Sequence, residues 1–218
     1  MTDTTIPNRC RLVLTAAAKD ANVTPARVSA ALEGGDVASL ILVGEGANDA
    51  AFQDWCEAIV GPAQARGVAV IIAGDTRIAG RVGADGIHAA GNAQDVGEAV
   101  KKQNGRMMVG ADGGKGRHEA LEIGEAQPDY VFFGRFGHDA KPEAHPRNLD
   151  LAEWWAAMIE IPCIVQAGSD LASLDAAAAT GAEFVALSAA IFAEGVDARA
   201  AVAEANRLLD ANAPRFEE

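Results

Sequence analysis

Two short turns late in the chain carry residues that suit the binding of a phosphate group. Gly168 follows one apolar run, residues 161–165, and Ser188 with Ala189 follows another, residues 183–187. A single predicted helix joins the runs, so they should be parallel neighbours whose exits open on the same sheet edge. Glycine lets backbone approach a ligand, and a helix start offers N–H groups to an anion. We predict phosphate binding by Gly168, Ser188 and Ala189, although an ordinary turn and helix cap would use the same residues.

The segment 134–148 carries a cationic cluster on an otherwise acidic chain. Its basic side chains are Arg135, His138, Lys141, His145 and Arg147. A mobile surface loop would have the same composition. The functional interpretation is a lid that binds substrate phosphate, with His138 as a general acid or base. Arg135 and Gln166, which follow two predicted strands, are predicted substrate contacts. Two histidines without a third ligand do not predict a zinc site.

Two aspartates follow predicted strands and are candidate metal ligands. Asp75 leaves the strand predicted at residues 68–72, and Asp95 follows the one at 83–88. Both could simply cap helices. Mg²⁺ needs only one or two protein carboxylates beside substrate phosphates, so we include both as candidate Mg²⁺ ligands. His88 ends a strand and could face a barrel mouth, but a buried, hydrogen-bonded histidine is the commoner outcome.

Composition narrows the classes of function. The 218 residues suit one domain, and the net charge of −13 argues against nucleic-acid binding, which needs clustered Lys and Arg. No stretch is long and apolar enough to cross a bilayer, and the N-terminus lacks signal-peptide features. Cys10, Cys56 and Cys163 are widely spaced, which predicts buried thiols in a reducing compartment. We expect a cytoplasmic protein without nucleic-acid or membrane partners.

The order of apolar runs and helical segments predicts the fold. Apolar runs lie at residues 11–15, 36–43, 68–72, 83–88, 106–110, 130–133, 161–165 and 183–187. Predicted helices follow at residues 25–33, 48–66, 76–82, 93–102, 117–126, 149–159, 170–180 and 197–211. Strict alternation favours parallel strands covered on both faces. Eight units predict an α/β fold, a single (β/α)₈ TIM barrel over residues 1–218 with residues 1–9 as a flexible leader. An open doubly wound sheet is the alternative, but it normally shows a glycine-rich turn after its first strand.

Three stretches together resemble the thiamine-phosphate synthase family, including its thiazole tautomerase branch. They are VIIAGDTRIAGRVGADGIH at residues 70–88, PDYVFFG at residues 128–134, and residues 161–192 with their EFVALSAAIF ending. Order and spacing agree over residues 68–210. The resemblance implies a single TIM barrel that joins a pyrimidine diphosphate to a thiazole phosphate, using Mg²⁺ and releasing pyrophosphate.

The phosphate half of the family's site matches this chain. The thiazole-phosphate site falls on Gly168 and on the turn of Ser188 and Ala189. Lys141 lies near the family's lysine after the sixth strand, which implies a catalytic role for Lys141. The threonine-rich run that precedes this lysine in the family is replaced by residues 135–139.

The diphosphate half of the family's site matches poorly. The family's Asn-Asp pair falls on residues 73–74, Ala-Gly, so a Mg²⁺ ligand is lost unless Asp75 substitutes. The acidic residue after the fourth strand corresponds to Asp95 only if the loop has lengthened. The family's Gln-x-Arg falls on residues 41–43, Ile-Leu-Val, which cannot bind a pyrophosphate.

The resemblance therefore implies a thiamine-phosphate-synthase-like enzyme of thiamine biosynthesis, acting on a phosphorylated thiazole or a related heterocycle. The poor diphosphate half predicts weak or no synthase activity. Two alternatives stay open. One is a thiazole tautomerase-like isomerase, which needs a phosphate anchor and a proton shuttle such as His138. The other is a non-catalytic barrel that binds a phosphorylated small molecule. A homo-oligomer is compatible with Trp154 and Trp155, which should pack outside the barrel or on a partner subunit.

Overall fold

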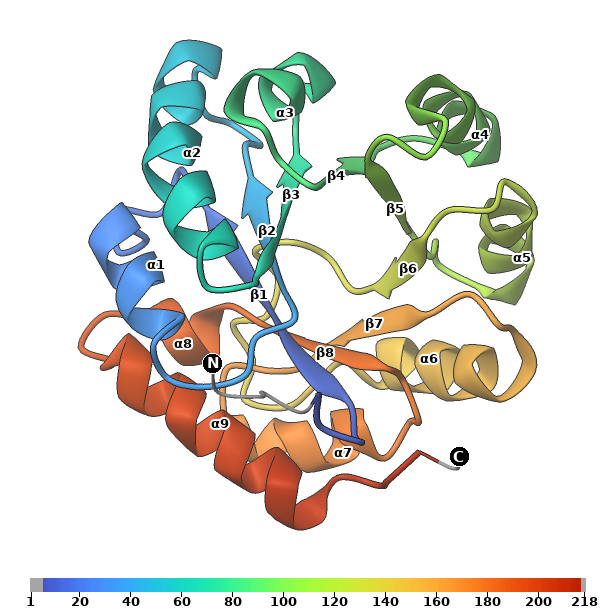
Figure 1. The fold of residues 1–218 in the computed structure, drawn as a ribbon. Coiled ribbons are helices and arrows are strands. Elements are labelled where there is room, and N and C mark those ends of the chain that lie inside the picture. Colours follow the sequence, from blue (N-terminus) through green and yellow to red (C-terminus); the bar gives the residue numbers. More distant parts are fainter. Residues whose placement is uncertain (1–5, 217–218) are drawn as a thin grey trace.

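The predicted strands form a closed parallel barrel in the computed structural model, which describes residues 6–216 (Figure 1). Each strand pairs with its neighbours in chain order, and β8 closes the ring against β1. The strands are β1 (Arg11–Ala17), β2 (Ser39–Val43), β3 (Ala69–Ala73), β4 (Gly86–Ala89), β5 (Met108–Asp112), β6 (Tyr130–Phe133), β7 (Cys163–Gln166) and β8 (Phe184–Leu187). The TIM barrel is confirmed, and the open doubly wound sheet is excluded.

Helices surround the barrel and alternate with the strands (Figure 1). They are α1 (Pro25–Ala31), α2 (Asp49–Gln64), α3 (Thr76–Val82), α4 (Ala93–Gln103), α5 (Arg117–Glu125), α6 (Pro146–Met158), the 3₁₀ turn η1 (Leu171–Ser173), α7 (Leu174–Ala178), α8 (Ala189–Phe192) and α9 (Ala198–Asn212). Side-chain caps set several starts. Asn48 accepts from the Ala50 N–H at 3.0 Å, and Thr24 accepts from the Arg27 N–H at 3.3 Å ahead of Pro25.

Three boundaries differ from the sequence prediction where they shape the site. Helix α6 begins at Pro146 instead of residue 149, because proline suits the first helical position. Strand β5 continues to Asp112 instead of ending at residue 110, because it pairs with β6 through Asp112 and Phe132. Strand β7 includes Gln166, which pairs with β8. Hydrophobicity alone could not place these ends, since polar residues complete both strands.

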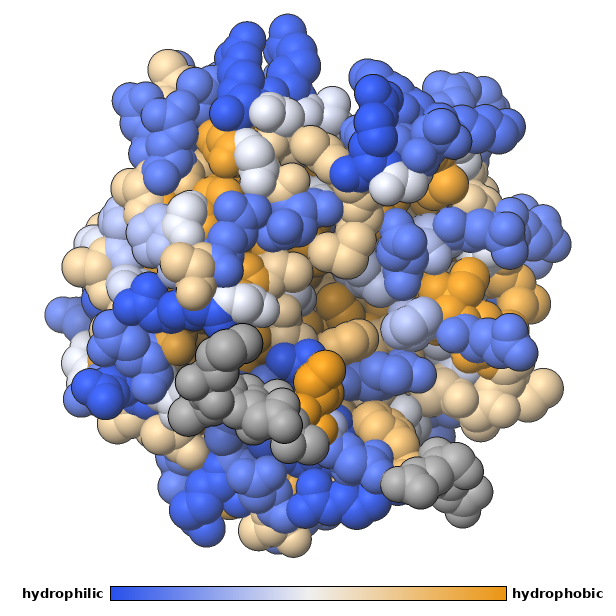
Figure 2. Space-filling view, in the orientation of Figure 1, coloured by the Kyte–Doolittle hydropathy of each residue, from blue (hydrophilic) through white to orange (hydrophobic). Residues whose placement is uncertain are grey.

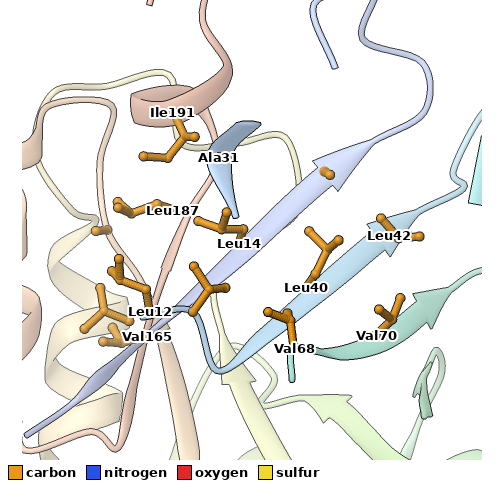
Figure 3. Close-up of a cluster of buried hydrophobic side chains, with 14 of the residues drawn as sticks. Leu12, Leu14, Ala31, Leu40, Leu42, Val68, Val70, Val165, Leu187 and Ile191 are labelled. Atoms are coloured by element: carbon orange, nitrogen blue, oxygen red, sulfur yellow. The ribbon is translucent and has the colours of Figure 1, made fainter. Parts of the chain in front are cut away.

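The core has two layers because strand side chains alternate between the two faces of the barrel wall. Leucines and valines of the outer face pack beneath the helices; Figure 3 labels Leu12, Leu14, Leu40, Leu42, Val70 and their neighbours. A second cluster fills the barrel itself and consists of Val13, Ile41, Val43, Ile71, Tyr130, Phe132, Ile164 and Ala186. Each fully buried leucine contributes about 1.5–3 kcal/mol to folding. The barrel interior is therefore packed, and a ligand must bind at one of its ends.

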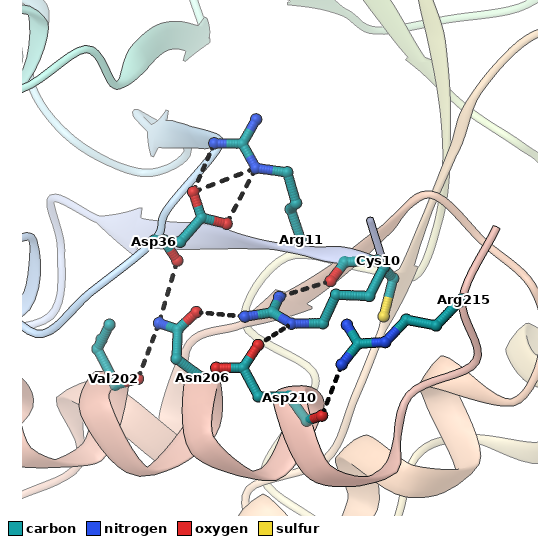
Figure 4. A network of polar contacts seen from close by, with 8 residues as sticks. Cys10, Arg11, Asp36, Val202, Asn206, Asp210 and Arg215 are labelled. Carbon is teal, nitrogen blue, oxygen red and sulfur yellow. Dashed lines mark hydrogen bonds and ion pairs between the residues drawn. The ribbon is translucent and has the colours of Figure 1, made fainter. Parts of the chain in front are cut away.

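A polar network closes the N-terminal end of the barrel (Figure 4). Arg9 is only 2 % exposed, and its guanidinium donates to Asp210 Oδ1 at 2.8 Å and to Asn206 Oδ1 at 3.0 Å. Arg11 makes a two-pronged ion pair with Asp36, with contacts of 2.6 and 2.9 Å. Asn206 also donates from Nδ2 to the Asp36 carbonyl at 3.1 Å. These hydrogen bonds hold helix α9 against the residues that precede β1 and β2.

The surface of the molecule shows the usual separation of polar and apolar residues. Figure 2 shows hydrophilic residues around the rim and more hydrophobic residues towards the centre of this face. Arg9, the last residue of the expected flexible leader 1–9, is buried and paired with Asp210, and residues 1–5 lie outside the described residues. None of the helices in the described part of the chain has the length and apolarity that crossing a bilayer requires.

Candidate active site at the C-terminal end of the barrel

The connection between β6 and α6, residues 134–145, folds back over the C-terminal ends of β7 and β8. The Ser169 N–H donates to the Lys141 carbonyl at 2.8 Å. Gly168 packs so closely beneath this loop that a Cβ there would overlap the backbone of Pro142. The loop is therefore docked on the turns that the sequence assigns to phosphate.

The two predicted phosphate turns have hydrogen-bond partners within the protein. The Gly168 N–H donates to Ser173 Oγ at 2.9 Å, and the Ala189 N–H donates to Asp139 Oδ2 at 2.7 Å. Asp139 is 7 % exposed, so a resident carboxylate lies against the start of α8, where Ser188 is the N-cap. The expected open cradle is thus absent from this conformation. Phosphate binding by Gly168, Ser188 and Ala189 stays a prediction that requires the loop to move.

A cavity of about 770 Å³ lies between the 134–145 loop, the start of α6 and the end of β7. Its cationic and imidazole lining consists of Arg135, His138, Lys141, His145 and Arg147. Gln166 also lines it and is 4 % exposed. Its Oε1 accepts from the Arg135 N–H at 2.7 Å, whereas its Nε2 has no hydrogen-bond partner among the described residues. The structure therefore brings the predicted catalytic and substrate-binding residues together around one cavity.

The cations of this cavity are available to a ligand. Arg135, Lys141 and Arg147 are exposed, and none of them forms an ion pair with another described residue. His145 has a structural role instead: it is the N-cap of α6, and its Nδ1 accepts from the Arg147 N–H at 3.2 Å. The segment predicted as a loop up to residue 148 therefore ends at the helix start.

The two candidate Mg²⁺ ligands are engaged in capping. Asp75 caps α3 and forms an ion pair with Arg77, and this hydrogen bonding lowers the pKa of the Asp75 carboxyl to about 2. Asp95 accepts from the Asn92 N–H at 2.9 Å in a capping box at the start of α4. Among the residues that the structure describes, no group of three or more His, Cys, Asp or Glu is placed to hold a metal. These residues do not fit a resident Mg²⁺.

The ends of β2 and β3 at the mouth are apolar. Strand β2 ends at Val43 and β3 ends at Ala73, and these two residues are partners in the sheet. The Gly44 N–H donates to the Ala73 carbonyl at 2.9 Å, so these two backbone groups are paired within the protein. No cationic or amide side chain comes from residues 41–43. Val43 and Ala73 thus end these two strands with apolar side chains.

Three residues of neighbouring strands form a polar chain that the sequence analysis did not assemble. His88 is 6 % exposed, and its Nδ1 lies 3.0 Å from the Tyr130 hydroxyl. Its Nε2 lies 3.2 Å from Asp112 Oδ1. The expectation of a buried, hydrogen-bonded His88 is confirmed. The sequence contains one indication of this contact, because the three residues come from three consecutive strands, β4, β5 and β6. The apolar pattern alone places Tyr130 inside a strand and Asp112 in the loop after one, and it predicts no contact between them.

Comparison with known proteins identifies relatives along nearly the whole chain. A family model described as thiamine monophosphate synthase matches residues 11–191. The thiamine-phosphate synthase of Rhodospirillum centenum is 33 % identical over 205 residues, covering 92 % of this chain and 98 % of that protein. The thiamine-phosphate synthase of Hyphomonas neptunium is 32 % identical over 218 residues, covering 96 % and 99 %.

Solved structures show the same fold at lower identity. A thiamine phosphate pyrophosphorylase from Pyrococcus furiosus matches with a TM-score of 0.74 at 18 % identity, covering 94 % of this chain and 97 % of that one. The (S)-3-O-geranylgeranylglyceryl phosphate synthase from Thermoplasma acidophilum, solved with sn-glycerol-1-phosphate, matches with a TM-score of 0.62 at 15 % identity, covering 91 % and 93 %. These two likenesses support the fold alone.

Proposed function

The chain belongs to the thiamine monophosphate synthase family and has a thiamine-phosphate-synthase-like function, and on this premise we propose a specific reaction and site. The enzyme joins a pyrimidine diphosphate to a phosphorylated thiazole or a related heterocycle at the C-terminal mouth of the barrel. The observation that carries the proposal is the cavity of about 770 Å³, whose lining combines exposed cations with Gln166. Within the part of the chain that the structure describes, Arg135, Lys141 and Arg147 form no ion pair and the buried Gln166 Nε2 has no hydrogen-bond partner. An anionic ligand would satisfy all of these groups at once.

The cationic residues of the cavity stabilise the leaving group in this proposal. As the carbon–oxygen bond to the diphosphate breaks, its electron pair goes to the departing oxygen, and negative charge grows there. Lys141 and Arg135 supply the compensating positive charge. Electrostatic stabilisation of charge that develops in the transition state is usually the largest single contribution of an enzyme to catalysis. His138, which is exposed on the same loop, is the candidate general acid. Gln166 donates a hydrogen bond that orients the bound group.

The phosphate of the second substrate is assigned to Gly168, Ser188 and Ala189. Its entry requires the 134–145 loop to release these turns, because Asp139 now accepts the Ala189 N–H. The loop therefore acts as a lid that opens for the substrate and closes over it. Mg²⁺ is given no role on the described residues, because Asp75 and Asp95 serve as helix caps.

An assay for thiamine phosphate formation from the family's pyrimidine diphosphate and thiazole phosphate tests this function. We expect product at a rate below about 1 s⁻¹, slower than typical enzymes, because β2 and β3 offer no diphosphate ligands. Absence of product together with tight binding of the thiazole phosphate would favour a non-catalytic barrel and contradict the proposal. Isomerisation of the thiazole alone would contradict it in favour of a tautomerase.

A further inference from the structure

The polar chain of Tyr130, His88 and Asp112 runs from the packed interior to the solvent. Tyr130 and His88 are both 6 % exposed, whereas the Asp112 side chain is 59 % exposed at the end of β5. The chain thus ends in a carboxylate at the mouth. The buried Tyr130 and His88 therefore restrict the Asp112 carboxylate to one position. Without them, this exposed side chain would sample several rotamers.

The contacts of His88 with Tyr130 and Asp112 use both ring nitrogens. Burial, with the nearby charge of Asp112 as a smaller contribution, raises the pKa of Tyr130 far above its ordinary value, so the hydroxyl keeps its proton. A tyrosine hydroxyl can donate or accept, and the tautomer of His88 decides which of the two it does towards Nδ1. A proton on His88 Nε2 donates to Asp112 Oδ1, and this hydrogen bond holds the carboxylate in place.

The surroundings connect this chain to the lid. Phe136, on the 134–145 loop, packs edge-on to His88 with a ring separation of 5.0 Å, and Phe132 of β6 does so at 6.0 Å. The aromatic rings exclude water from the imidazole and strengthen its hydrogen bonds. Asp112 Oδ2 has no hydrogen-bond partner among the described residues, so one oxygen is free to face a ligand.

We propose that Asp112 is a catalytic residue that compensates the positive charge formed on the substrate ring, and that His88 and Tyr130 are its positioning residues. The inference rests on the proposed function. In that reaction the lone pair of the thiazole ring nitrogen forms a bond to the methylene carbon, and the carbon–oxygen bond to the diphosphate breaks. The nitrogen becomes a quaternary cation, and the formation of this bond requires no proton transfer to or from the nitrogen. A fixed carboxylate at the mouth stabilises this cation as it forms.

A pair of ligands that differ only in this charge tests the role of Asp112. Thiamine phosphate carries the cationic ring, and 3-deazathiamine phosphate replaces its charged nitrogen with carbon at nearly the same shape. Calorimetry should show that the wild-type chain binds the cation about tenfold or more tightly than the neutral analogue, as expected for one close charge pair. The isosteric variant Asp112→Asn should lose this preference while keeping its thermal unfolding temperature. Asp150→Asn, at an exposed position of α6, is the matched control and should keep the preference.

The outcomes distinguish a failure of the proposed function from a failure of the role of Asp112. If the wild-type chain binds neither ligand, the proposed function fails and the inference fails with it. If it binds both equally, or if Asp112→Asn keeps the preference for the cation, only the role of Asp112 is overturned.

Variants of His88 separate positioning from packing. His88→Gln retains an N–H donor and should keep most of the preference for the cationic ligand, whereas His88→Leu fills the space without a donor and should lose about as much of it as Asp112→Asn. Tyr130→Phe should weaken the preference less. Equal behaviour of His88→Gln and His88→Leu, in folded proteins, would contradict the positioning role. His118→Gln, on an exposed histidine of α5, should change nothing.

Discussion

The two ends of the barrel use charge in opposite ways. At the N-terminal end, Arg9 is buried and its donors are matched by Asp210, Asn206 and a backbone carbonyl. At the C-terminal end, the buried Asp139 accepts from a backbone N–H and has no cationic partner among the described residues. Gln166 Nε2 is buried there with no hydrogen-bond partner among the same described residues. A buried polar group without a partner costs free energy, so such groups persist where a ligand can satisfy them. The comparison separates an end that holds the fold together from an end that is prepared for binding.

The difference in partners should produce a difference in phenotype. Substitutions at the N-terminal end should change the free energy of unfolding and leave the activity of folded molecules intact. Substitutions at the mouth should do the reverse. The following experiments test this division between stability and activity. It would be contradicted by a substitution at the N-terminal end that lowers only activity, or by one at the mouth that lowers only stability.

The largest expected effect is the loss of stability in Arg9→Ala. The substitution leaves the buried Asn206 Oδ1 without its donor and empties the space of a fully buried side chain, whereas Asp210 is 61 % exposed and adds little. The free energy of unfolding should fall by about 3 kcal/mol. Urea denaturation followed by circular dichroism measures it. The control is Arg207→Ala, since Arg207 pairs with Glu204 on the surface and its loss should leave the midpoint unchanged. A large loss of turnover per folded molecule in Arg9→Ala would contradict the division.

The second effect is the loss of activity in Lys141→Ala. Removing a cation that faces the leaving group should reduce kcat by about 100-fold. The thermal midpoint should not change, because Lys141 is exposed and makes no ion pair with another described residue. Lys102→Ala, at an exposed position of α4, is the matched control. Full activity in Lys141→Ala would remove Lys141 from the site.

A smaller effect is expected from Asp139→Asn, which weakens the contact of the lid with α8. Without the charge of Asp139, the Ala189 N–H should bind inorganic phosphate more readily, and the affinity should rise by about tenfold, within the usual range of coupling between two states. Hydrogen exchange of residues 134–145 should also accelerate. Glu153→Gln, at an exposed position of α6 outside the cavity lining, should leave both measurements unchanged. Unchanged phosphate affinity in Asp139→Asn would show that the turns are not the phosphate site.

The smallest effect concerns the cysteines, which lie in the stable framework. Burial raises the pKa of Cys10 to about 11 and that of Cys56 to about 12, and it raises the pKa of Cys163 as well. A raised pKa keeps these groups as neutral thiols, and the thiolate is the reactive form. At pH 8 the native protein should therefore react with a disulfide reagent only as fast as it unfolds. Rapid labelling of the folded protein would show that this framework opens locally.

Much of the architecture could be predicted from local signals. The helices predicted at residues 25–33 and 48–66 begin at the caps Thr24 and Asn48, and all eight predicted strands are present because their apolar runs are bounded by turns. Strand ends were less certain where polar residues continue the ladder, as at Asp112. The cationic cluster around one cavity was also predictable, because one loop contains most of it.

The amino-acid sequence by itself determined the alternation of strands and helices, the acidic surface and the position of the cationic loop, since each depends on residues close together in the chain. Only the tertiary structure decided which distant groups meet. Asp139 reaches the Ala189 N–H across 50 positions, and His88 reaches Tyr130 across 42. Such contacts depend on how the barrel closes and how the lid docks, and no local pattern encodes either. They cover the turns that were expected to form an open cradle, and they bring the buried His88 into contact with a carboxylate at the mouth.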